Sequence, residues 1–155
     1  GMVAQLHLAL VMAIDAKLLI LDEPTLGLDI LYRKQFYDSL LNAYFDRPRT
    51  IVVTTHQVDD VEHVLTDLMF IHQGRIVLNC KMDDFESKYL ELTVVPDQLQ
   101  AARALNPLHE RQLLGRTTLL YTNVPREQLT NLGEVRTPNI SDVFVAVIES
   151  QAPHK

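Results

Sequence analysis

The chain has 155 residues, 47% of them hydrophobic, and a formal net charge of −6 at pH 7. This length and apolar content predict a globular protein with one sizeable core or two small units. The acidic balance argues against nucleic acid or an acidic membrane surface as a partner, because both attract a broad basic face. The sequence has no run long enough to span a membrane as a helix, and its single cysteine, Cys80, excludes an internal disulfide.

The first half of the chain predicts alternating strands and helices. The strands are short apolar runs that end in polar residues, as in buried parallel sheets, and the helices are apolar or amphipathic stretches. Strands are expected at 17–21, at 50–56 and in a hairpin over 68–79 that turns at Gln73-Gly74, and helices at 2–14, 30–45 and 57–69. This order predicts a doubly wound α/β arrangement with a parallel sheet covered by helices.

The second half predicts the element order of a ferredoxin-like unit, which is strand, helix, strand, strand, helix, strand. These elements are expected at 88–96, 97–106, 109–114, 116–123, 125–133 and 134–138, with Gly115 turning the central hairpin. A last helix, capped by Ser141, carries an apolar stripe that consists of Val143, Phe144, Val147 and Ile148. The predicted fold class is therefore α/β, with a partial parallel sheet in residues 1–82 and a small α+β domain in residues 83–155.

Two adjacent acids, Asp22 and Glu23, directly follow the apolar strand at 17–21. Ligands of doubly wound sheets bind outside the carboxyl ends of the strands. An aspartate at this place can hold Mg²⁺ directly or through water, and a neighbouring glutamate can polarise the water that attacks a terminal phosphate. Alone, the pattern also fits two solvated acids that open a loop.

Two segments, LLILDEPTLGLD at 18–29 and TIVVTTH at 50–56, together resemble the ATP-binding subunit of ABC transporters. In this resemblance the first segment contains the Walker B strand. Asp22 is then the carboxylate on the Mg²⁺ side, and Glu23 is the catalytic base. The resemblance implies ATP and Mg²⁺ as cofactors.

The resemblance implies roles for three further residues. Asp29 ends the segment similar to the D-loop and would lie at the seam between two ATP-binding subunits. His56 is similar to the switch histidine that contacts the γ-phosphate, although an isolated histidine at a strand end would be an ordinary one. Gly1 stands where the last glycine of the signature segment falls, unless it is an addition from cloning. Asp29 and Gly1 are thus expected to be cofactor-binding.

The sequence departs from the family pattern in one important respect. It contains no G-x-x-x-x-G-K-[ST] loop, whose backbone amides and lysine hold the phosphates. The family's Gln-Arg pair and a later arginine fall at Ala4, Gln5 and Leu10. The chain is therefore expected to be a C-terminal fragment that is inactive alone and that self-associates through strand edges or the helix at 2–14.

The complete parent would bind and hydrolyse ATP to drive transport, on the cytoplasmic side of a membrane. Its partners would be a membrane-embedded transporter subunit and a second ATP-binding subunit. The alternative is a noncatalytic interaction or regulatory module that binds a complete ATPase subunit. An ABC-type ATPase of DNA repair or translation is less favoured, because no long coiled coil or paired domain is visible.

Residues 83–150 are similar to a small C-terminal appendage that some subunits of this family carry, often those of export systems. They contain no cluster of acids, histidines or cysteines that would suggest chemistry. A packing or dimer-supporting role is expected for them, with regulation by a small ligand as the other possibility.

Overall fold

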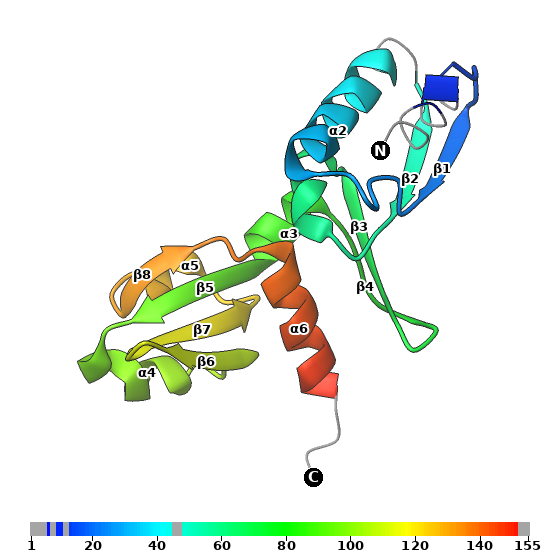
Figure 1. Cartoon of the computed structure of the whole chain (residues 1–155). Helices are drawn as coiled ribbons and strands as arrows, with labels where there is room; N and C mark the ends of the chain where they lie inside the picture. The colour runs from blue at the N-terminus through cyan, green and yellow to red at the C-terminus, as the bar shows by residue number, and fades with distance from the viewer. Residues whose placement is uncertain (1–5, 7–8, 11–12, 45–47, 152–155) are drawn as a thin grey trace. The chain divides into compact units, whose positions relative to one another are not determined.

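The structure is a computed structural model that describes residues 6, 9–10, 13–44 and 48–151 (Figure 1). It confirms a mixed α/β protein. The chain divides into two compact units, residues 1–64 and 65–155. The domain boundary between residues 82 and 83 remains a prediction, and most of the helix expected at 2–14 lies outside the described residues. In the part of the chain that the structure describes, no helix is long and apolar enough to cross a membrane.

The first unit contains the predicted parallel strands, β1 (Leu18–Asp22) and β2 (Thr50–Thr54), and the predicted helix α2 (Ile30–Tyr44). The two strands pair in register from Leu18 with Thr50 to Asp22 with Thr54. This register brings the carboxyl ends of β1 and β2 together.

Burial in the first unit follows the period of each element. On β1, Leu19 and Leu21 are buried, whereas Leu18 and Ile20 are 53% and 64% exposed. The prediction of a fully buried strand is therefore wrong for the described residues, where β1 buries one face only. The buried side of α2 consists of Phe36, Tyr37 and Leu40, whose three- and four-residue steps match the period of a helix.

The helix predicted over 57–69 is absent, and the described residues there form two short 3₁₀ turns, η1 (Val58–Asp60) and η2 (Glu62–Val64). The apolar residues Val58, Val61 and Val64 recur every three residues, which matches the three residues per turn of a 3₁₀ helix. Val61, which is 2% exposed, anchors this segment.

The second unit begins with the predicted hairpin of β3 (Asp67–His72) and β4 (Arg75–Lys81). Its turn residues Gln73 and Gly74 have φ angles of 49° and 74°, as the tight turn requires. β3 pairs antiparallel with β4 in a two-stranded sheet. The doubly wound arrangement predicted for the first half of the chain remains a prediction. Helix α3 (Met82–Lys88) follows, which the sequence analysis missed.

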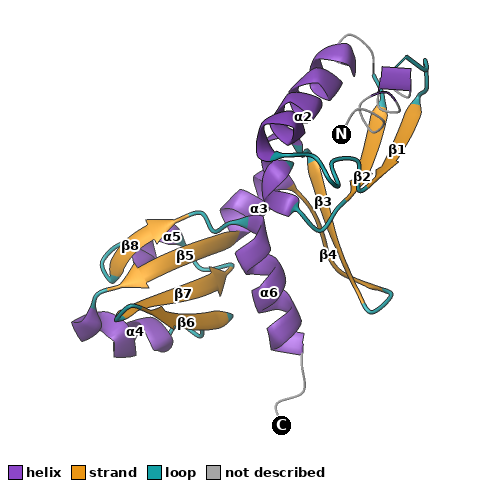
Figure 2. Ribbon diagram, in the orientation of Figure 1, coloured by secondary structure: helices purple, strands orange, loops and turns teal. Residues whose placement is uncertain are grey.

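The second sheet of this unit is antiparallel and has the strand order β6-β7-β5-β8 (Figure 2). Its strands are β5 (Tyr89–Val94), β6 (His109–Leu113), β7 (Arg116–Thr122) and β8 (Gly133–Arg136). The intervening elements are η3 (Pro96–Gln98), α4 (Leu99–Arg103) and α5 (Arg126–Leu129). The core between this sheet and the two helices contains Leu90, Leu92, Val94, Ala102, Leu119, Tyr121 and Leu129.

The last helix, α6 (Ile140–Gln151), begins one residue before Ser141. Ser141 is therefore not the cap, and Asn139 occupies that position, with its carbonyl accepting a hydrogen bond from Val143 N at 3.2 Å. Asparagine and serine are similarly favoured at this position, so the sequence did not distinguish them. The predicted stripe is confirmed in its buried members, and the Phe144 ring packs edge-on against Phe70 of β3 at 5.0 Å between centroids.

Candidate functional site

Asp22 and Glu23 lie at the joined carboxyl ends of β1 and β2. The hydroxyl of Thr54 donates a hydrogen bond to Asp22 Oδ1, and the Glu23 amide donates to the Thr54 carbonyl at 2.8 Å. The first contact joins the side chains of the last register pair, and the second continues the strand pairing by one residue. The end of β2 thereby fixes the position at which both carboxylates leave the sheet.

The backbone turns sharply at Glu23, whose φ of 44° lies in the left-handed region that few residues other than glycine adopt. The side chain is then held by the residues that follow β2. Glu23 Oε2 accepts a hydrogen bond from Thr55 Oγ1 at 3.1 Å. Glu23 Oε1 accepts one from the His56 amide at 3.0 Å and lies 2.7 Å from His56 Nδ1. The structure therefore brings Glu23 and His56 into direct contact.

Electrostatics favour the ionised form of Glu23. The hydrogen bond from the His56 side chain is the main cause that lowers the pKa of Glu23, and bonds from Thr55 and the His56 amide add to it, while partial desolvation opposes them. An ionised carboxylate only accepts hydrogen bonds, so His56 Nδ1 must carry the proton in this contact. Nε2 is then the ring nitrogen left for a ligand, on a side chain that is 66% exposed.

Asp29 caps helix α2. Its Oδ1 accepts a hydrogen bond from Tyr32 N at 3.1 Å, and its carbonyl accepts one from Arg33 N at 3.0 Å. Gly27, with a φ of 78°, provides the left-handed turn in the preceding loop. The described contacts of Asp29 are thus local to the start of the helix, and Gly1 lies outside the described residues.

Two residues of this cluster, Thr54 and Thr55, were not singled out from the sequence. Each donates a hydroxyl to one of the two acids. The signal was available, because TIVVTTH places two hydroxyl side chains directly between an apolar run and the candidate histidine.

Comparison with known proteins supports the family resemblance, although no protein-family model matches the chain. The Nod factor export ATP-binding protein I of Rhizobium etli is 28% identical over 159 residues, which are 94% of this chain and 49% of the relative. The protein of the same name from Cupriavidus metallidurans is 32% identical over 157 residues, 94% of this chain and 52% of the relative. The chain is a homologue of ABC ATP-binding proteins.

The extent of the match differs among these ABC ATP-binding proteins. The energy-coupling factor transporter ATP-binding protein EcfA2 of Staphylococcus saprophyticus is 30% identical over 80 residues, 52% of this chain and 28% of the relative. The match to the two Nod factor export proteins includes most of the chain. The chain spans about half the length of those two relatives.

The residues present at the end of β1 fit the metal that ABC ATP-binding proteins use with ATP. In the described ranges, no group of three or more His, Cys, Asp or Glu could hold a metal alone. Mg²⁺ bound with a nucleotide needs only one or two protein carboxylates, because phosphates and water supply the other ligands. Asp22 is exposed, and one of its carboxylate oxygens accepts a hydrogen bond from Thr54. Its other oxygen suits the role of a Mg²⁺ ligand.

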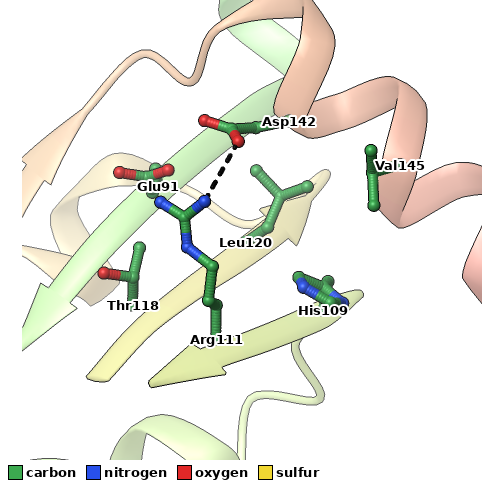
Figure 3. Close-up of a pocket in the computed structure, with 7 residues that line it drawn as sticks. All are labelled: Glu91, His109, Arg111, Thr118, Leu120, Asp142 and Val145. Atoms are coloured by element: carbon green, nitrogen blue, oxygen red, sulfur yellow. Dashed lines mark hydrogen bonds and ion pairs between the residues drawn. The ribbon is translucent and has the colours of Figure 1, made fainter. Parts of the chain in front are cut away.

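The second unit of this ABC ATP-binding homologue contains a separate pocket beside α6 (Figure 3). It has a volume of about 120 Å³ and is lined by Glu91, His109, Arg111, Thr118, Leu120, Asp142 and Val145. Its acidic, arginine and histidine side chains already have partners within the unit. Glu91 pairs with Arg136 at 2.5 Å, Arg111 with Asp142 at 3.5 Å, and His109 with Glu149 at 3.0 Å. This pairing favours a packing role for the surface over ligand binding.

Proposed function

We propose that the chain forms the C-terminal part of an ABC-type ATP-binding subunit, whose first unit contributes catalytic groups to a site that hydrolyses ATP. The observation that carries this proposal is the carboxylate of Glu23, held by Thr55 and His56 at the joined ends of two parallel strands. A general base must be ionised and fixed within reach of its proton. Three hydrogen-bond donors fix the Glu23 carboxylate, and the lowered pKa keeps it ionised.

The residues of the cluster then have distinct roles. Asp22 holds Mg²⁺, which neutralises part of the negative charge of the phosphates when it is bound. Glu23 orients the attacking water and accepts its proton through the lone pair that Thr55 leaves free on Oε2. His56 Nε2 binds a γ-phosphate oxygen when it also carries a proton, since a hydrogen bond to phosphate requires a donor. Asp29 lies at the seam with a second subunit, and Gly1 is the last glycine of the signature segment.

The remaining parts of the proposal concern the whole subunit. Residues 83–155 form a ferredoxin-like appendage with a packing or dimer-supporting role. The strand order β6-β7-β5-β8 supports the ferredoxin-like fold of this part. The complete protein couples ATP hydrolysis to transport through a membrane-embedded subunit, on the cytoplasmic side of the membrane. The words export and transporter in the names of the relatives support this role.

A second candidate is a noncatalytic module that binds a complete ATPase subunit or a second copy of itself. The apolar face of the parallel strands favours this candidate, because Leu18, Ile20 and Val52 are 53%, 64% and 42% exposed. Contiguous apolar surface of this kind marks contact sites in soluble proteins. In the first candidate, the same face is covered by the other half of the subunit.

Hydrolysis in a complete subunit that contains this chain tests the proposal. Glu23→Gln keeps the size of the side chain but removes the base, so kcat should fall by about a hundredfold or more while Mg-ATP affinity changes less than about twofold. Asp22→Asn should weaken Mg²⁺-dependent binding as well. His56→Ala should lower kcat far more than affinity.

The matched control is Asp38→Asn, which removes a carboxylate from the exposed side of α2 and should leave kcat unchanged. Equilibrium binding of Mg-ATP and steady-state hydrolysis are measured for every variant. Hydrolysis that survives Glu23→Gln would contradict the catalytic role. A complete subunit that neither binds nor hydrolyses ATP would favour the noncatalytic module.

A further inference from the structure

Arg33, in the first turn of α2, connects the two loops that emerge from β1 and β2. Its Nε donates a hydrogen bond to the carbonyl of Leu28 at 2.8 Å, in the loop that follows Glu23. Its Nη1 forms an ion pair with Asp60 Oδ2 at 3.1 Å, in the turn that follows His56. The Arg33 and Asp60 side chains are 22% and 26% exposed, so water screens the pair only partly.

A continuous series of hydrogen bonds leads from this ion pair to the candidate base. Asp60 N donates to the Gln57 carbonyl at 3.2 Å, and Gln57 N donates to Thr55 Oγ1 at 3.0 Å. The same hydroxyl of Thr55 donates to Glu23 Oε2 at 3.1 Å. The position of Asp60 therefore affects the orientation of the group that holds the carboxylate of Glu23.

The other arm of Arg33 also leads back to Glu23. Leu28 N donates to the Thr25 carbonyl at 3.1 Å, and Leu26 N donates to the Glu23 carbonyl at 3.1 Å. One guanidinium thus holds the loop on the main-chain side of Glu23 and the turn on its side-chain side.

Tyr37 lies one turn after Arg33 on α2 and is fully buried. Burial is the main cause that raises the pKa of Tyr37, the neighbouring Thr25 opposes it, and the charges of Asp60 and Glu23 raise it further. The Tyr37 hydroxyl has no hydrogen-bond partner in the described structure. Arg33 therefore leaves α2 beside its closely packed side, where a displaced loop cannot relax without disturbing its neighbours.

We propose that Arg33 is a positioning residue for ATP hydrolysis, which orients Glu23 and His56 by holding both loops at once. This inference rests on the proposed function. An arginine suits the role because its planar fork presents several donors in fixed directions, whereas lysine is a single point donor. A lysine at this position could contact Asp60 or the Leu28 carbonyl but would not hold both in the same geometry.

The kinetic test uses the complete subunit with Arg33→Gln, Arg33→Lys, Asp60→Asn and the Arg33→Gln/Asp60→Asn double variant. Arg33→Gln should lower kcat about tenfold and change the KM for ATP less than about twofold, because the nucleotide contacts remain while the base is misaligned. Arg33→Lys should recover part of the loss. The double variant should be no worse than the more affected single variant, since both changes break one pair.

The matched control is Lys34→Gln, which removes a positive charge from the neighbouring exposed position of α2 and should retain wild-type kcat. Far-UV circular dichroism checks that each variant folds. Three results would overturn the inference. They are a wild-type kcat in Arg33→Gln, a rise in KM by the same factor as the fall in kcat, and effects of the two substitutions that multiply fully in the double variant.

A second measurement on the present chain needs no hydrolysis. The amides of His56 and Gln57 donate to Glu23 Oε1 and Thr55 Oγ1, so their hydrogen exchange reports directly on the coupling. Arg33→Gln should accelerate both by about tenfold, and Lys34→Gln should not. Unchanged exchange overturns the inference even if Glu23→Gln abolishes hydrolysis. If Arg33→Gln accelerates exchange but Glu23→Gln leaves hydrolysis unchanged, the coupling is upheld and the proposed function is refuted.

Discussion

Replacement of Tyr121 by phenylalanine should destabilise the antiparallel sheet by a small amount that depends on pH. Tyr121 on β7 is fully buried, and its hydroxyl donates a hydrogen bond to the Ala102 carbonyl of α4 at 2.8 Å. The same carbonyl also accepts the Leu105 amide at 3.1 Å, so it keeps a partner in the variant. The loss in unfolding free energy at pH 7 should therefore be about 1 kcal/mol, rather than the larger cost of an orphaned buried carbonyl.

The pH dependence has a definite sign. Burial is the main cause that raises the pKa of Tyr121 from 10.0 to about 12, and the charge of Glu110 adds to it. Below pH 10 both folded and unfolded chains keep the phenolic proton, so its contribution to stability is fully present. Between pH 10 and 12 the unfolded chain loses this proton while the folded chain keeps it, which lowers the unfolding free energy of the wild type. Tyr121→Phe lacks this loss.

Urea unfolding followed by far-UV circular dichroism, from pH 7 to pH 11, checks the prediction. The advantage of the wild type should be about 1 kcal/mol at pH 7 and should shrink above pH 10. Tyr32→Phe is the control, because Tyr32 is 47% exposed and should give no difference with this pH profile. A constant difference between wild type and Tyr121→Phe at all pH values would refute the reasoning about burial.

Two further substitutions test the local geometry. Gly133→Ala should lower the unfolding free energy by about 1–3 kcal/mol, because a Cβ on β8 would lie 2.2 Å from the Thr93 carbonyl oxygen of β5. A wild-type Tm in thermal unfolding would contradict this prediction. Asp29→Ala should cost about 1 kcal/mol through loss of the cap on the Tyr32 amide, whereas Asp29→Asn should retain most of the stability; equal losses in the two variants in urea titrations would exclude the capping role.

Much of the local structure could be predicted from apolar periodicity and turn residues. The strand that ends at Asp22, the helix from Ile30 and the hairpin at Gln73-Gly74 all follow short-range patterns, and each is present. The segment after His56 was mispredicted because a three-residue apolar repeat is close to the helical period, and a 3₁₀ turn satisfies it equally well.

The contacts that organise the candidate site could not be predicted in the same way. Glu23 adopts a positive φ, and the donors that hold it come from residues more than thirty positions later in the chain. Only the pairing of β1 with β2 brings them together. The motif indicated which residue types to expect at the end of each strand, but the role of Arg33 depends on a fold of the intervening loops that no local pattern encodes.

The pairing of Glu91 with Arg136 has an evolutionary consequence. These residues are direct partners across β5 and β8, and the Glu91 side chain is only 4% exposed. Loss of the arginine alone would leave a buried carboxylate without its counter-charge, which costs more than replacement of both residues by apolar ones. Lineages of this domain should therefore change the two positions together, and sequences that carry one member of the pair without the other should be rare.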